Sequence, residues 1–182
     1  MRTLRILTAF LLASTASAHS GSVTSGFGAG ILHPLAGPDH LLAMVSIGIL
    51  AAPFGKRGLW IPAAFMTAMM LGGLSGVAGL HLPFMEQGVA LTVLTLGLLL
   101  AFTSRLPPGT LALLAGVMGL LHGHAHGTEL PENVGALEFF TGFTVATGLL
   151  HVVGYGLGVR AGLRRGVGLG VAAAGAWLLL GA

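Results

Sequence analysis

The stretch HPLAGPDH, residues 33–40, decides the fold, because it places two histidines, an aspartate and two prolines inside a long apolar segment. Residues 25–53 contain no other ionisable side chain and are long enough to cross a membrane. Burying ionisable groups at membrane depth costs several kcal/mol, so such a cluster is by default functional. The structural alternative is that His33 and His40 hydrogen-bond to neighbouring helices while Asp39 caps a helix end.

The pair Gly37 and Pro38 predicts a break in this segment. Proline is tolerated as the first residue of a helix, where its missing N–H costs nothing. Asp39 and His40 would then lie in the first turn of a new helix, where the helix dipole stabilises a carboxylate. Broken helices at membrane depth are tolerated where they line a cavity. We therefore expect one membrane crossing with an irregular middle, built as a site.

The composition is that of an integral membrane protein. The chain has 182 residues, of which 54% are hydrophobic and 7% charged, and its mean hydropathy is +0.93. A soluble domain carries about 25% charged residues. The basic residues are scattered in ones, twos and threes between apolar runs, which argues against nucleic acid as a partner. There is no cysteine, so histidine and carboxylate are the strong metal ligands that remain.

Residues 1–18 have the pattern of a cleavable signal peptide. Arg2 and Arg5 precede a short apolar core at residues 6–13, and Ala16 and Ala18 fit a small-residue cleavage site. The mature chain, residues 19–182, would begin at His19 and form a single transmembrane domain. An uncleaved signal anchor is the alternative.

Six apolar segments predict an all-α polytopic bundle of about six transmembrane helices, at residues 25–53, 59–80, 86–103, 108–126, 135–159 and 166–181. The basic and acidic residues of the loops alternate: Lys56, Arg57, Arg105, Arg160, Arg164 and Arg165 in the first, third and fifth, and Glu86, Glu129 and Glu132 in the second and fourth. The positive-inside rule then places the basic loops in the cytoplasm of a bacterium. The mature N-terminus and the second and fourth loops would lie outside the cytoplasmic membrane.

A second motif, LHGHAHGTE at residues 121–129, lies at the outer end of the fourth segment. On a regular helix His122 and His126 share a face while His124 points elsewhere; in an extended chain all three share one side. Neutral imidazole binds nickel, copper, zinc or iron, and Glu129 could be a ligand or orient a histidine ring. Helical rise places His122 and Asp39 at similar depths, so two helices could present ligands to one point. The alternative is a solvated histidine-rich loop.

The two motifs, H-x5-D-H and H-G-x-A-H-G-x-E, resemble the signatures of the HupE/UreJ family of nickel permeases. The resemblance implies secondary transport of Ni²⁺ for hydrogenase or urease maturation. Co²⁺ is the next candidate for the transported ion, and iron and copper also stay open. It implies no prosthetic group and no enzymatic activity. The motif positions in this chain are His33, Asp39, His40, His122, His126 and Glu129.

Other residues carry lesser expectations. His124 belongs to the second motif, and His19, once exposed by cleavage, could chelate an incoming ion through its α-amine and imidazole. His151, in the fifth segment, is either a ligand on the exit side or a histidine that bonds another helix. Glycine spacings such as Gly72 to Gly76 and Gly154 to Gly158 predict close helix packing.

No G-x-x-x-x-G-K-[ST] motif for nucleotide binding is present, which favours transport without ATP. Two rival functions stay open: a metal-binding accessory protein that does not translocate the ion, and a membrane metalloenzyme, although carboxylates are few for a di-iron centre. Association with further copies of the chain is also open.

Overall fold

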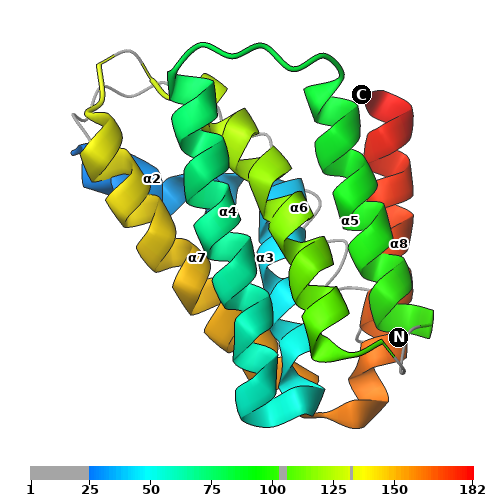
Figure 1. The fold of residues 1–182 in the computed structure, drawn as a ribbon. Helices are drawn as coiled ribbons and strands as arrows, with labels where there is room; N and C mark the ends of the chain where they lie inside the picture. The colour runs from blue at the N-terminus through cyan, green and yellow to red at the C-terminus, as the bar shows by residue number, and fades with distance from the viewer. Residues whose placement is uncertain (1–24, 103–105, 132) are drawn as a thin grey trace.

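The computed structural model describes residues 25–102, 106–131 and 133–182, and every regular element in these ranges is a helix. The expected signal peptide, its cleavage site and His19 lie outside the described residues, as do Arg105 and Glu132. The predicted all-α membrane fold is confirmed, and its helices form one bundle (Figure 1).

The first segment is broken where the sequence predicts. Helix α2 (Gly26–Ala36) ends one residue before Gly37, and helix α3 (Pro38–Ala51) begins with Pro38 in its first turn. Asp39 lies in that turn. Figure 1 shows α2 crossing the upper part of the bundle while α3 runs down along it, so the break also changes the direction of the chain.

The remaining helices follow the predicted segments to within a few residues. A 3-10 segment, η2 (Ala52–Leu59), links α3 to α4 and reverses the chain at Gly55, whose φ of 52° favours glycine. A shorter one, η3 (Ala161–Leu163), links α7 to α8. The long helices after α3 are α4 (Trp60–Val77), α5 (Met85–Phe102), α6 (Pro108–Thr128), α7 (Ala136–Gly158) and α8 (Arg164–Gly181).

Glycines let neighbouring helices pack backbone against backbone. A Cβ at Gly72 would overlap the carbonyl oxygen of Leu120, and one at Gly154 would overlap that of Val45, so α4 lies on α6 and α3 on α7. Gly97 does the same for α5 against α8. The close packing predicted from the glycine spacing is therefore confirmed.

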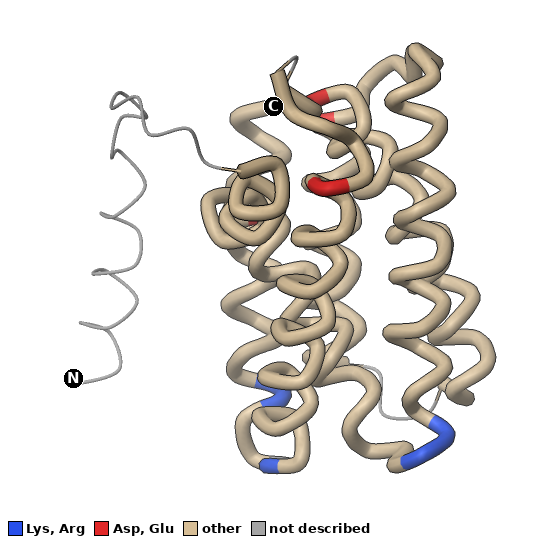
Figure 2. The backbone as a smooth tube through the Cα atoms, turned by 90° about the vertical axis from the view of Figure 1, so that its left-hand side faces the viewer, with Lys and Arg blue, Asp and Glu red and all other residues tan. Residues whose placement is uncertain are grey.

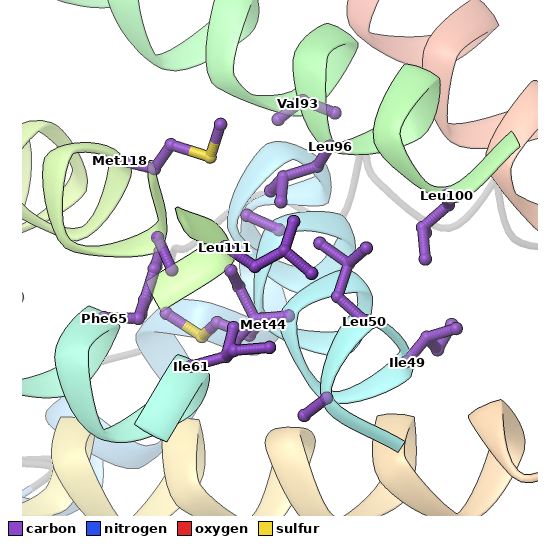
Figure 3. Close-up of a cluster of buried hydrophobic side chains, with 14 of the residues drawn as sticks. Met44, Ile49, Leu50, Ile61, Phe65, Val93, Leu96, Leu100, Leu111 and Met118 are labelled. Atoms are coloured by element: carbon purple, nitrogen blue, oxygen red, sulfur yellow. The ribbon is translucent and has the colours of Figure 1, made fainter. Parts of the chain in front are cut away.

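A cluster of apolar side chains lies between α3, α4, α5 and α6 (Figure 3). Met44 of α3, Phe65 of α4 and Leu111 of α6 are at most 3% exposed, and Leu96 and Leu100 of α5 complete the cluster on the other side. One member of the cluster, Phe143 of α7, also contacts the ring of His126, so the apolar core borders the polar residues of the second motif.

The exposed surface of the bundle carries many large apolar side chains, as insertion into a membrane requires. Three helical stretches of the described chain are long and apolar enough to cross a membrane: Pro38–Val77, which joins α3 to α4, Met85–Phe102 and Ala136–Gly158. Helices α6 and α8 lie beside them with 21 and 18 residues. Leu113 and Leu137 are 70% and 83% exposed, as expected for side chains that face lipid.

Charged side chains divide between the two ends of the bundle (Figure 2). We call one end the acidic end, which carries Asp39, Glu86, Glu129 and Glu138, and the other the basic end, which carries Lys56, Arg57, Arg160, Arg164 and Arg165. The break between α2 and α3 lies at the acidic end, so both histidine motifs lie there too.

Candidate metal centre

Four side chains from three helices converge at the break in the first segment. They are His33 of α2, His40 of α3, His126 of α6 and Glu129, the residue that ends α6, and one ligand atom from each lies within 4.8 Å of all the others. We call this group the outer centre. A metal ion with bonds of about 2.1 Å holds opposite ligands about 4.2 Å apart, so only small rotations of these side chains would close the group on an ion.

The hydrogen bonds within the outer centre show why a cation suits it. Nε2 of His33 lies 2.9 Å from Nδ1 of His126 and 3.3 Å from Oε2 of Glu129. Two imidazole nitrogens can face each other at hydrogen-bond distance only if one of them carries a proton. A metal ion can replace that proton, because it accepts lone pairs from both rings and from the carboxylate.

Asp39 holds the ring of His40 rather than pointing at the other histidines. Its Oδ1 accepts a hydrogen bond of 2.6 Å from Nδ1 of His40. This leaves Nε2 of His40 buried, with no hydrogen-bond partner among the described residues. A carboxylate on one nitrogen fixes the tautomer and makes the other nitrogen a better ligand. A Cβ on Gly37 would lie 2.8 Å from His40 Nδ1, so glycine at the break leaves room for this pair.

His122 lies one helical turn below His126, fully buried, with its ring centroid 5.5 Å from that of His40. The hydroxyl of Thr92 donates to the carbonyl of Val89 at 2.7 Å, so the 2.7 Å contact between Thr92 Oγ1 and His122 Nε2 requires His122 to donate. Its Nδ1 is then a bare lone pair, and it has no partner among the described residues. His122 therefore offers a further donor directly beside the outer centre.

His124 is not brought to the outer centre. The second motif is helical as far as Thr128, so His124 points to the far side of α6, where its Nδ1 lies 2.8 Å from the Ser75 hydroxyl of α4. Gly123 and Gly127 also face α4, since a Cβ on them would overlap the carbonyl oxygens of Met69 and Gly73. The spacing of four residues between His122 and His126, and between Gly123 and Gly127, thus gives α6 one face for the site and one for packing.

A cavity of about 600 Å³ leads from the acidic end to the outer centre. Asp39, His40 and Ala125 line it, with Glu86 and Glu129 among its carboxylates, and α8 contributes Trp177. The cavity combines negative charge with histidine, which raises the local concentration of cations.

An aromatic wall closes the other side of the outer centre. The ring of Phe143 lies 4.1 Å from that of His126, and the ring of Phe139 lies 5.3 Å from that of His33, measured between centroids. Both phenylalanines come from α7 and are at most 1% exposed. They shield the buried ring of His126, which strengthens electrostatic contacts there, whereas the His33 side chain is 25% exposed.

Sequence reasoning missed several residues of this site. Thr92 and Ser75 are ordinary hydroxyl residues in apolar helices, and only the packing of α4 and α5 against α6 shows that they fix histidine tautomers. Phe139 and Phe143 gave no signal beyond their hydrophobicity. Glu86 did give a signal, because the sequence assigns it to a loop that carries acidic and no basic residues.

Comparison with known proteins identifies the family of the chain. A sequence model described as HupE / UreJ protein matches residues 7–178. The chain is also 44% identical to Protein HupE of Rhizobium leguminosarum bv. viciae over 182 residues, which cover 96% of this chain and 95% of that protein. No solved structure matches the chain. With its two histidine motifs meeting at one point of a helical membrane bundle, the chain belongs to the HupE/UreJ family.

Proposed function

We propose that this chain is an ATP-independent transporter that carries Ni²⁺, with Co²⁺ as the next candidate, into the bacterial cytoplasm for metalloenzyme maturation. One observation carries the proposal. Three imidazoles and a carboxylate from three helices meet within 4.8 Å at a helix break, beside a cavity of about 600 Å³.

The donor set fits a divalent ion of intermediate softness. Imidazole and carboxylate suit nickel, cobalt, copper and zinc, whereas thiolates would be expected in a site for Cu(I). Such a site binds Cu²⁺ more tightly than Ni²⁺ in vitro. The choice of nickel therefore rests on the resemblance to nickel permeases, and we propose it on that basis.

The separation of charge supports an inward direction. Basic residues cluster on the cytoplasmic side of membrane proteins, so the basic end would face the cytoplasm and the acidic end, with its cavity, the periplasm. A doubly charged ion moving inward gains about 4.6 kcal/mol per 100 mV, at about 2.3 kcal/mol per charge. Uptake therefore needs no nucleotide.

The proposed path begins with capture at the cavity mouth. Glu86 and Glu129 attract the ion, and the imidazoles of His33, His40 and His126 replace part of its water shell. Asp39 keeps Nε2 of His40 directed for binding, as its hydrogen bond to Nδ1 indicates. His122 accepts the ion next, since its Nδ1 has no hydrogen-bond partner among the described residues.

The test is uptake of radiolabelled Ni²⁺ into proteoliposomes that contain the purified protein. We expect saturable uptake by the wild-type protein and a loss of at least tenfold in Asp39→Asn and His40→Ala. The expected loss follows from the effect of removing a ligand or its orienting partner. Glu138→Gln is the matched control, because Glu138 lies at the same end but outside the four converging groups.

The outcomes separate the rival functions. Binding of nickel without flux would support the accessory protein that does not translocate. Unchanged uptake in both variants would contradict the assignment of the outer centre as the capture site. A metalloenzyme would show neither flux nor a dependence of flux on these residues.

A further inference from the structure

His151 of α7 is a buried histidine that the outer centre does not use. Its side chain belongs to a residue that is 5% exposed, and neither ring nitrogen has a hydrogen-bond partner among the described residues. By contrast, the buried histidines His122 and His124 of α6 each have a hydroxyl partner. Within the described part of the chain the His151 ring therefore bonds no other helix, and a buried imidazole without partners costs stability.

His151 lies further toward the basic end, beyond Phe65. The ring of Phe65 lies 5.8 Å from that of His122 and 5.6 Å from that of His151, between centroids. Phe65 is fully buried. Along α7, His151 follows Phe143, which contacts the outer centre, by eight residues, or about 12 Å of helical rise. A single aromatic ring thus separates the last histidine of the outer region from His151.

Two further donor atoms lie near this level. Thr147 precedes His151 by one turn on α7, and its hydroxyl donates to the thioether sulfur of Met44 at 3.3 Å. Met44 follows His40 by one turn on α3. Figure 3 shows Met44 and Phe65 in the same part of the apolar cluster. The backbones of α3 and α7 touch at this level, because a Cβ at Gly48 would overlap the carbonyl oxygen of His151.

We propose that His151, with Thr147 and Met44 beside it, is an inner station for the divalent metal ion that the outer centre captures. The proposal rests on the transport function proposed above and adds a second binding step to it. The ion passes from His122 to His151 when the ring of Phe65 moves aside. A station with one imidazole and two weak donors holds the ion less tightly than the outer centre, as conduction requires, because an ion must also leave.

The test uses His151→Leu and His151→Cys in the full chain, reconstituted in proteoliposomes, with Ni²⁺ as the probe. For His151→Leu we expect uptake at least tenfold slower than in the wild type, binding at the outer centre within about twofold of the wild type, and an equal or higher melting temperature. The melting temperature should not fall, since leucine removes two unpaired polar atoms from a buried position. His151→Cys keeps a metal ligand and should retain more uptake than His151→Leu. Tyr155→Phe, one turn further along α7, is the matched control.

Three results would count against the inner station. Uptake by His151→Leu at the wild-type rate, equal losses in His151→Leu and His151→Cys, or a lower melting temperature would overturn the inner station, the last because it would show that the ring is a packing element. These results would leave the transport function standing if the wild type moves nickel and His40→Ala does not. A wild-type protein that binds nickel without moving it would overturn both proposals.

Discussion

At the scale of single residues, neighbouring groups fix which nitrogen of each histidine is available. Asp39 occupies Nδ1 of His40, and Thr92, whose own proton goes to the Val89 carbonyl, occupies Nε2 of His122. The two rings therefore offer opposite nitrogens, Nε2 of His40 and Nδ1 of His122, and both are buried without partners among the described residues. Bare nitrogens of this kind are positions at which a metal ion relieves the cost of burial.

A first prediction concerns Thr92. We expect Thr92→Val to lower nickel uptake on the order of tenfold, because the ring of His122 loses the acceptor that fixes its tautomer and orientation. Thr92→Ser should restore most of the uptake, since serine keeps the hydroxyl. Uptake into proteoliposomes measures the effect, and nitrogen NMR of labelled histidine reports the tautomer.

Thr95→Val is the matched control for this prediction. Thr95 lies one turn further along α5, is more exposed, and gives its proton to the carbonyl of Leu91 in its own helix. Uptake should stay within about twofold of the wild type. If Thr92→Val transported as well as Thr95→Val did, the hydroxyl would have no part in placing His122.

The convergence of the two motifs could be predicted from the sequence, whereas the partners of each ring could not. Counting helical rise from the basic loops placed Asp39 and His122 at one depth, and the structure brings their helices together. The depth of a residue does not give the rotation of its helix about the helix axis, however. Which helix each face contacts depends on how the helices pair in the bundle. Thr92 and Ser75 became visible only once α5 and α4 were placed against α6. That the converging residues bind metal stays a prediction.

At the scale of elements, α4 and α6 form a close pair whose glycines set the position of the second motif. Cβ atoms at Gly119, Gly123 and Gly127 would each overlap a backbone carbonyl of α4. Because α6 cannot move away without losing these contacts, His122 and His126 are held toward α3. This glycine stripe, Gly119, Gly123 and Gly127, thus packs α6 against α4 and also positions the histidines of the site.

The second prediction tests the backbone contact that the glycine stripe makes with α4. Gly123→Ala should destabilise the protein by about 1–3 kcal/mol, the usual cost of overpacking, because the new methyl group overlaps the carbonyl oxygen of Met69. Nickel uptake should fall as well, since α6 must shift. Thermal unfolding of the purified protein in detergent measures the first effect.

Gly116→Ala provides the control on the same helix. A Cβ there would lie 3.9 Å from the nearest atom, the carbonyl oxygen of Ala64, which is an ordinary contact. Alanine should be neutral or stabilising by up to about 1 kcal/mol, because it is the better helix former. Equal melting temperatures for the two variants would show that the helices are not in backbone contact at Gly123.

The boundaries of the helices were predictable because local chemistry sets them. Gly37 and Pro38 end one helix and begin the next in both the prediction and the structure. The choice between helix and extended chain for residues 121–129 stayed open in the sequence, since three alternating histidines fit both. The structure decides for helix because α6 gains its contact with α4 through this stretch. That pairing is a property of the bundle and leaves no local mark in the motif.

At the scale of the whole molecule, the acidic cavity and the apolar core would give the proposed transport path a barrier. On that path a cation would meet carboxylates and imidazoles at the acidic end, then an apolar cluster that includes Met44 and Phe65. An ion cannot leak through such a layer. Movement across it therefore depends on a rearrangement of side chains or helices, and its direction depends on the driving force across the membrane.

The third prediction tests that driving force. For a carrier that moves Ni²⁺ alone, the accumulation ratio at equilibrium should rise about tenfold for every 30 mV of potential, negative inside, because two charges gain about 4.6 kcal/mol per 100 mV and about 1.4 kcal/mol is a factor of ten. Potentials set with potassium gradients and valinomycin across proteoliposomes, at equal pH on both sides, provide the measurement. An exchange of one Ni²⁺ for two protons would be electrically neutral and would give a ratio that ignores the potential and follows the pH gradient. Since imidazoles must be free of protons to bind the ion, lowering the pH on both sides should slow uptake in either case, and only the dependence on potential separates the two mechanisms. A slope near zero at equal pH would therefore contradict uniport while leaving the outer centre as the point of capture.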